Sequence, residues 1–326
     1  MKALLRIALA MCAAMILPGC GRQTTLEVGQ GPYRVGFLSA SSSPSFVDAL
    51  KDGLTKQGLV EGKNLELDSK ITTNEAELAN LAKELAAAKV DLIIAGGTKA
   101  VEAAKEATSE IPIVMTNSGD AVKTGLVVSL QKPGGNITGL TQISPLLAPK
   151  RLELIKEAFP ASNKVAVIWN PDHPTTQLSH QELVGASPGL GIELISLPTK
   201  DASEIGPAFA SAASKGAGSA IVLRDPFMVK NQDTLVAAAD SNKLPAIYET
   251  INFVEAGGLM LYGPSFEDLY RRSATYVSKI LKGADPAELP VEQPRRFELI
   301  INMRTAKASG FDIADSVLRR ADRLIE

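Results

Sequence analysis

The sequence predicts an α/β protein with two doubly wound lobes, each built on a parallel sheet, and a cleft between them. Three observations lead to this prediction. Short apolar segments alternate with helical segments of about ten to fifteen residues, which is typical of parallel sheets covered on both faces. This order of strand, helix and polar loop starts at Arg34 and starts again at Lys164. A chain of 326 residues is also long enough for two domains.

Each element of the first half follows from its local pattern. The strand segments are apolar runs or alternate polar and apolar residues; they are 34–39, 64–71, 90–95 and 111–116. The helical segments place apolar residues three and four positions apart; they are 44–57, 75–89 and 98–108. Gly58 follows the first of these helices, as is usual where a helix ends.

The second half repeats the pattern. Strands are expected at 164–169, 192–197, 219–223, 246–249 and 297–301. Helices are expected at 175–184, 203–214, 231–242, 266–282 and 305–309. Three Gly- or Pro-rich segments are candidates for the crossings between the lobes: 132–140, 256–264 and 284–294. This assigns residues 33–141 and 259–288 to lobe 1, and residues 142–258 and 289–326 to lobe 2.

The first twenty residues are interpreted as an export signal. Lys2 and Arg6 precede an apolar run at 7–17, which is shorter than the roughly 20 residues that cross a membrane. The run ends in LPGC, which resembles the bacterial lipobox and predicts a lipid on Cys20. We expect an exported protein that is lipid-anchored to the cell envelope, with residues 21–32 as a polar tether. The alternative is an ordinary secreted protein cleaved nearby.

Composition and missing motifs exclude several classes of function. Thirty-four Lys and Arg against 36 Asp and Glu leave a net charge of −2, so nucleic acid is not an expected partner. Two cysteines and two histidines leave little for a metal site, and none is predicted. The sequence has no dinucleotide fingerprint, P-loop or catalytic Ser or Cys motif, so we expect no cofactor and no enzyme.

Polar loops follow the predicted strands, at the edge where ligands bind in such sheets. In the first half, the candidate ligand-binding residues are Ser41, Ser42, Ser43, Ser45, Gly97, Thr98, Asn117 and Asp120. Serine hydroxyls and free N–H groups at helix starts suit a carboxylate, and an aspartate suits an ammonium group. The alternative for each loop is a helix cap or a tight turn.

The second half offers a matching set. Its candidate ligand-binding residues are Asn170, Thr175, Asp225 and Tyr248. We expect a small zwitterion held through its carboxylate by the serine loop and by Gly97 and Thr98, with Asp120 or Asp225 on its ammonium group. These groups bind by hydrogen bonds and charge, and they form no nucleophile–base–orienter set.

Several stretches together resemble the tryptophan/tyrosine-type group of ABC transporter substrate-binding proteins. They include VGFLS, VDLIIAGGTKAVEAA, VAVIWNP and FVEAGGLMLYGP, and the resemblance extends from Arg34 to the end of the chain. It implies a periplasmic-binding-protein type I fold with three crossings between the lobes. It also implies a small-molecule ligand, an amino acid and in some members an aromatic one, delivered to an ABC permease with a separate ATPase subunit.

The sequence departs from this group at the cleft loops. Asp120 follows a glycine where the group commonly has Asp-Pro, and Arg224 stands where an apolar or small residue is common. His173 replaces a smaller residue. Arg224 in particular favours a more acidic or longer substrate. Three other functions remain open: a receptor for a membrane sensor kinase, an enzyme on a similar scaffold, and a structural lipoprotein.

Overall fold

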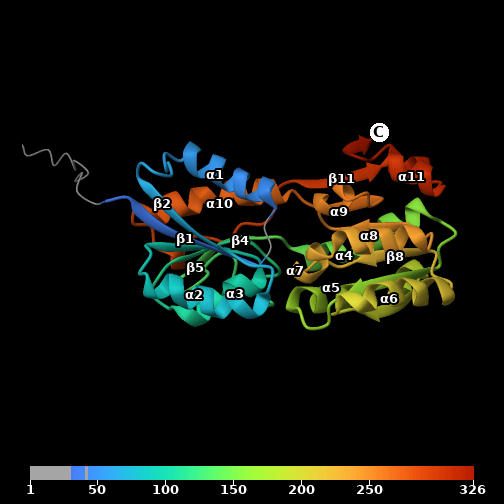
Figure 1. The fold of residues 1–326 in the computed structure, drawn as a ribbon, viewed down its shortest axis with the longest axis horizontal. Helices are drawn as coiled ribbons and strands as arrows, with labels where there is room; N and C mark the ends of the chain where they lie inside the picture. The colour runs from blue at the N-terminus through green and yellow to red at the C-terminus, as the bar shows by residue number, and fades with distance from the viewer. Residues whose placement is uncertain (1–30, 41–42) are drawn as a thin grey trace, which may run out of the picture. The chain divides into compact units, whose positions relative to one another are not determined.

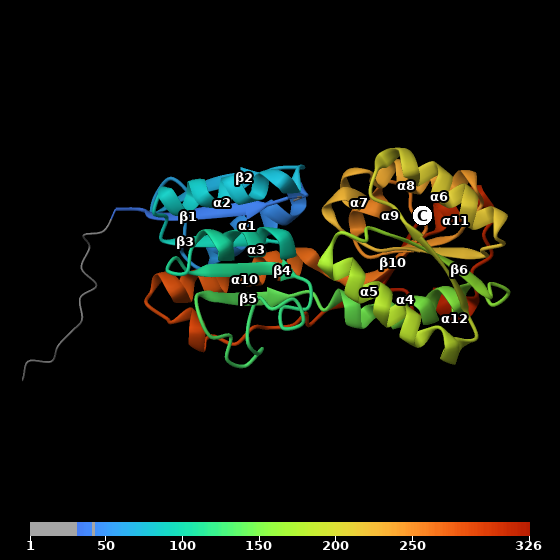
Figure 2. The same ribbon diagram turned by 90° about the horizontal axis from the view of Figure 1, so that it is seen from below.

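The chain is described by a computed structural model that places residues 31–40 and 43–326. The signal at 1–20, most of the tether at 21–32, Cys20, Ser41 and Ser42 lie outside the described residues. Within the described part, no helix is long and apolar enough to cross a membrane. The fold contains two separate β-sheets, each flanked by helices (Figures 1 and 2).

The first sheet has five parallel strands in the order β2-β1-β3-β4-β5. Its strands are β1 (Tyr33–Ser39), β2 (Leu65–Ile71), β3 (Leu92–Gly96), β4 (Ile113–Ser118) and β5 (Ile137–Thr141). From β1 the chain adds β2 on one side, and it then returns to add β3 on the other side of β1. The carboxyl ends of β1 and β3 are therefore the topological switch point, where ligands bind in open α/β sheets. Ser39 and Gly96 lie side by side there.

Helices cover both faces of this sheet. Figure 1 shows α1 (Pro44–Lys56) and α10 (Phe266–Leu281) on one face, with α2 (Leu78–Ala87) and α3 (Thr98–Ala107) on the other. Neighbouring strand residues face opposite sides, so Phe37 packs in the core under α1 and α10, and Leu38 packs in the core under α2 and α3. The helix expected at 75–89 begins only at Leu78, because residues 75–77 form a 3₁₀ turn that Asn74 caps.

The second sheet has seven strands in the order β12-β11-β10-β9-β8-β6-β7. They are β6 (Lys164–Trp169), β7 (Glu193–Pro198), β8 (Ser219–Val222), β9 (Ala246–Tyr248), β10 (Met260–Pro264), β11 (Phe297–Asn302) and β12 (Arg323–Ile325). The two doubly wound lobes are thereby confirmed. The second sheet is not wholly parallel, however, because β10 and β11 run antiparallel.

Helices also enclose the second sheet (Figure 2). One face carries α4 (Ser144–Ala158), α5 (Pro174–Ala186) and α12 (Asp315–Leu318). The other carries α6 (Ala202–Ser214), α8 (Gln232–Ser241) and α9 (Ile251–Glu255). Two further short helices are α7 (Pro226–Lys230) and α11 (Met303–Ser309). Phe209 and Phe253 fill one core, while Leu152 and Val165 fill the other.

The structure corrects where the chain passes between the sheets. The segment 132–140 contains most of β5 and stays with the first sheet. Strand β10 belongs to the second sheet, although 259–288 was expected in lobe 1. Glu292 donates its N–H to the carbonyl of Gly139, so this part of 289–326 pairs with the first sheet instead of the second. Apolar pattern alone could not show these pairings, which are made by backbone atoms.

The observed crossings are therefore short. They lie between β5 and α4, between β10 and α10, and between Glu292 and β11. Ile143, in the first crossing, has φ of 50°, a left-handed conformation that a β-branched residue rarely adopts.

A buried ion pair joins the segments beside two of these crossings. Arg151 on α4 is 0% exposed, and its Nη2 lies 3.4 Å from Oε2 of Glu249, which follows β9. Its Nε donates to the carbonyl of Tyr262 on β10 at 2.7 Å, and its Nη2 donates to Oγ of Ser144 at 3.0 Å. Burial lowers the pKa of Arg151, while Glu249 opposes this effect. The charge is therefore stabilised by one carboxylate and several oxygen acceptors.

We expect Arg151→Met to destabilise the protein by about 3–5 kcal/mol, because it leaves Glu249 buried without a cation. Urea unfolding of the two proteins measures the difference. Lys150→Ala is the matched control, since Lys150 is the neighbouring residue and forms only an exposed pair with Glu153; it should cost about 1 kcal/mol or less. If Arg151→Met lowers the free energy of unfolding no more than Lys150→Ala does, the buried pair of Arg151 and Glu249 does not have the stabilising role expected here.

Candidate functional site

A narrow cavity lies where the strand ends of both sheets meet. Its described walls come from the carboxyl ends of β1, β3, β4 and β5 and from the loops after β6 and β8; they are Ala40, Gly96, Gly97, Thr98, Lys99, Ala100, Asn117, Gln142, His173, Arg224 and Pro226. Both sheets thus point their carboxyl ends at one place, the position expected of a ligand site. The cavity is about 20 Å³, enough for about one water molecule.

Two threonines connect the sheets across this cavity. Oγ1 of Thr98, at the start of α3, lies 2.9 Å from Oγ1 of Thr175, at the start of α5. The N–H of Gly119 donates to the same Thr98 oxygen at 2.9 Å. Further along, Nζ of Lys123 pairs with Glu182 of α5 at 2.8 Å. The loops of the two lobes therefore touch directly in this structure.

Buried polar atoms without a hydrogen-bond partner gather at the same place. Three of them belong to the cavity walls: Oε1 of Gln142, Nδ1 of His173 and Nε of Arg224. Ser118 Oγ, at the end of β4, is a fourth. Buried polar groups normally have partners, and an unpaired one costs about 1–3 kcal/mol. A ligand with complementary donors and acceptors would satisfy this set.

Burial controls the charges around the cavity. Burial, together with the nearby positive charges of Lys99 and Arg224, lowers the pKa of His173 to about 3, so His173 is neutral at pH 7. Burial also lowers the pKa of Arg224, whose guanidinium lies 4.8 Å from the centre of the Phe266 ring. The pKa of Glu75 is raised to about 7, first by burial and then by the charge of Asp225.

The structure brings several of the sequence candidates together. Gly97, Thr98 and Asn117 line the cavity, and Thr175 contacts Thr98. Asn170 donates to Asp225, which is 1% exposed and also caps α7 by accepting the N–H of Met228 at 2.7 Å. Asp225 therefore has a structural role beside any role in binding.

Other candidates lie elsewhere. Oδ1 of Asp120 accepts hydrogen bonds from the N–H groups of Val122 and Lys123. Asp120 thus stabilises a tight turn, which was the alternative to ligand binding for this loop. Tyr248 packs in the core against Phe253, with ring centres 4.8 Å apart, and is absent from the described cavity walls. Ser43 and Ser45 bond each other at 3.2 Å and are likewise absent from those walls.

Sequence reasoning missed three groups near the cavity. Gln142 follows β5, a strand assigned at first to a crossing, so its position at a strand end could not be seen. Lys99 was not predicted because lysines are common in the helices of this sequence, although it lies in the first turn of α3 and lines the cavity. Glu75 is brought near Asp225 only by the approach of the two lobes.

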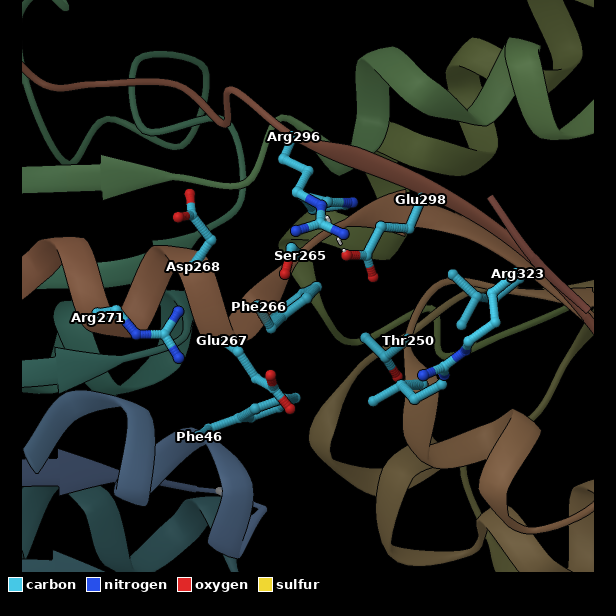
Figure 3. A pocket seen from close by; sticks show the side chains of 13 residues that line it. Phe46, Thr250, Ser265, Phe266, Glu267, Asp268, Arg271, Arg296, Glu298 and Arg323 are labelled. Carbon is cyan, nitrogen blue, oxygen red and sulfur yellow. Dashed lines mark ion pairs between the residues drawn. The ribbon is translucent and has the colours of Figure 1, made fainter. Parts of the chain in front are cut away.

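A larger cavity of about 290 Å³ lies beside the crossings (Figure 3). Its labelled charged residues include Glu267, Asp268 and Arg271 on α10, and Arg296, whose Nε pairs with Glu298 at 3.1 Å. Among its described walls only Thr250 has a buried polar atom without a partner. The smaller cavity, where three such atoms converge, is therefore the candidate ligand site. Within residues 31–40 and 43–326, no group of three His, Cys, Asp or Glu side chains is arranged to hold a metal ion.

Two lobes with facing strand ends and unsatisfied polar groups between them define a two-lobed binding protein. Comparison with known proteins supports this class and makes it specific. The family model described as ABC transporter substrate binding protein matches residues 35–325, so the chain belongs to that family. This is a family of solute-binding proteins, and the fold is that of periplasmic binding proteins of type I.

Individual relatives agree with this assignment. A tyrosine-binding protein of Clostridioides difficile is 31% identical over 81% of this chain and 74% of its own length. The crystal structure of an ABC domain from Streptococcus pneumonia in complex with L-Trp has a TM-score of 0.84 at 26% identity, covering 90% of this chain and all of that one. A conserved domain protein from Vibrio cholerae has a TM-score of 0.85 at 29% identity, over 90% and 99% of the two chains.

We expect Gly119→Ala to separate the lobes. A Cβ added there would lie 2.4 Å from Oγ1 of Thr175, closer than atoms can approach, so the threonine must move away. Small-angle X-ray scattering should show a larger radius of gyration than for the wild type. Thr175→Ala should reverse the effect in the double variant, because the nearest remaining atom, Cβ, is 3.1 Å away. Gly185→Ala, with open space around it on α5, is the control; a Gly119→Ala radius equal to that of the control would argue against the contact.

We expect Glu75 to contribute a loss of stability as the pH rises from about 4.5 to about 7. Its raised pKa means that the folded state holds a proton that the unfolded state has already released in this range, so its ionisation costs folding free energy. His173, with its lowered pKa, contributes a gain over much of the same range in both proteins. The melting temperature of Glu75→Gln minus that of the wild type should therefore increase as the pH rises toward 7. Glu106→Gln, an exposed glutamate on α3, should follow the wild type. Parallel pH profiles for wild type and Glu75→Gln would contradict the prediction.

Proposed function

We propose that this protein is the exported receptor of an ABC uptake transporter, and that it captures an amino acid or a similar small polar solute in the cleft. The observation that carries the proposal is the convergence of unpartnered buried polar atoms on one cavity between two facing sheet edges. Family membership supports the transport role, and relatives named for tyrosine and L-Trp support an amino-acid ligand.

Capture requires the lobes to move apart. A cavity of about 20 Å³ is far too small for an amino acid, so the ligand enters an open form and the second lobe closes over it. The three short crossings are the segments where such a hinge rotation takes place. Closure persists only if the ligand binds the closed form better than the open form.

The proposal assigns one group of the protein to each charged group of the ligand. The ligand carboxylate is held at the start of α3, where Thr98 and the preceding Gly97 offer N–H groups and the positive end of the helix dipole. The ammonium group is held by Asp225, which Asn170 orients from the loop after β6. Asp120 is the weaker candidate, since its carboxylate already holds a turn.

The partners follow from the same proposal. A permease with a separate ATPase subunit receives the ligand, and a lipid on Cys20 keeps the receptor at the cell envelope, with residues 21–32 as the tether. A receptor for a membrane sensor kinase would use the same cleft, and the neighbouring genes distinguish the two roles. An enzyme is disfavoured, because the groups at the cavity bind and orient without forming a nucleophile–base pair.

A thermal-shift screen against amino acids, small carboxylates and small amines tests the proposal. A ligand at 100 times its Kd should stabilise the protein by about 2.7 kcal/mol, which raises the melting temperature measurably. Thr98→Ala should abolish the shift, because Thr98 lies at the cavity and bridges the lobes. Thr73→Ala, an exposed threonine of the same lobe, should retain it. The absence of a shift with every compound would reject a receptor for these solutes.

A further inference from the structure

Arg224 lies in a wall of the cavity, where the charges of Tyr270, Glu249 and Asp225 offset only part of the effect of burial on its pKa. Only Leu223 separates it from the end of β8, and its Nε is buried without an acceptor. Of the carboxylates in the described ranges, none forms an ion pair within 4.0 Å of its guanidinium. Phe266, on which the guanidinium stacks at 4.8 Å, offers a ring face and no hydrogen-bond acceptor.

The two nearest acids are already engaged. Glu249 is paired with Arg151, and its other oxygen accepts the backbone N–H of Arg224 at 3.1 Å, so it holds the main chain of Arg224. The two oxygens of Asp225 accept from Asn170 and from the N–H of Met228. In this structure neither carboxylate forms an ion pair with the Arg224 side chain.

The other described walls of the cavity contribute no negative charge. Lys99 lines the cavity as well, and its pairing with Glu102 at 3.0 Å takes place on a partly exposed helix surface. His173 contributes a neutral ring, and Gln142 a free acceptor. Of the described residues that line the cavity, none is acidic and none is Phe, Tyr or Trp. Such walls suit an anion.

We propose that the ligand carries an anionic side group that binds the guanidinium of Arg224, so that the substrate is an acidic amino acid. This inference rests on the proposed function and specifies its ligand. A carboxylate placed on Arg224 satisfies the buried Nε and restores charge balance, and guanidinium binds carboxylate in two parallel hydrogen bonds. An aromatic side chain in this position would leave the Nε–H unsatisfied in a closed cavity.

The charge inventory agrees with a ligand of this class. An acidic amino acid has one ammonium and two carboxylate groups at pH 7. The start of α3 and Arg224 both line the cavity and offer positions for the two carboxylates. Asp225, which follows Arg224 in the same loop but is not among the described cavity walls, remains the group proposed above for the ammonium. A neutral aromatic amino acid has no second carboxylate for Arg224.

Isothermal titration calorimetry of the full-length protein with L-glutamate, L-aspartate, L-tyrosine and L-tryptophan tests the inference. We expect the wild type to bind at least one of the acidic pair more tightly than either aromatic amino acid. Arg224→Gln should weaken that binding about 30-fold or more, as is usual when one partner of a buried charge pair is removed. Arg224→Lys should weaken it less, because it keeps the charge and loses the second hydrogen bond.

Two controls keep the possible failures apart. Arg319→Gln, which removes an exposed arginine far along the chain, should bind like the wild type. Circular dichroism and melting temperature establish whether each Arg224 variant is folded. If Arg224→Gln does not fold, the binding measurements with Arg224→Lys test the inference. If tyrosine or tryptophan binds tightly and Arg224→Gln leaves that binding unchanged, the proposal of an anionic ligand is wrong, while the proposal of an amino-acid receptor stands. No binding of any of the four, together with no shift in the wider screen, would overturn the receptor itself.

Discussion

The buried pair of Arg151 and Glu249 is the interaction on which the binding region depends. Arg151 holds Ser144 just after the first crossing, the carbonyl of Tyr262 just before the second, and Glu249 after β9. Glu249 in turn holds the backbone of Arg224. One guanidinium thus connects two crossings to the cavity wall. A buried pair of this kind is a costly way to gain stability, and it serves here to define how these segments meet.

Strand direction provides the second constraint. All five strands of the first sheet point the same way, and in the second sheet β6, β8 and β9 also run parallel to one another. Their carboxyl ends carry short polar loops that begin helices, so free N–H groups and hydroxyls accumulate on both sides of the cavity. Thr98 and Thr175 each lie in the first turn of a helix that follows a strand, one in each lobe, and they meet.

Within this family the scaffold and the ligand are separable. The cores and strand order determine where the cavity lies, and a few wall residues determine what it accepts. In this chain the walls are polar and positive, with a neutral His173 and an unpaired Arg224. Under the proposed function, the buried Nε–H of Arg224 would disfavour any ligand that offers it no acceptor, so the site would select by exclusion as well as by attraction.

Much of the fold was predictable from local pattern. Alternation and short apolar runs located β1, β3, β4, β6 and β8, and helical spacing located α1, α3, α6 and α10. The same reasoning placed Gly97, Thr98, Asn117 and Arg224 at strand ends, where the structure shows them around one cavity. Strand β5 was missed because Ile137–Thr141 is short and follows a glycine pair, which indicated a loop.

Tertiary structure alone decided the rest. Which sheet receives β10, and which lobe receives residues 289–292, depends on backbone hydrogen bonds between segments far apart in the chain. Tyr248 was expected at the cleft, but its ring turns into the core because Phe253 packs there. The sequence by itself determined the elements and the polar character of the strand ends, since these follow from side-chain type and spacing. The pairing of Arg151 with Glu249, the nearness of Glu75 to Asp225 and the isolation of Arg224 arise only when distant segments pack together and exclude water.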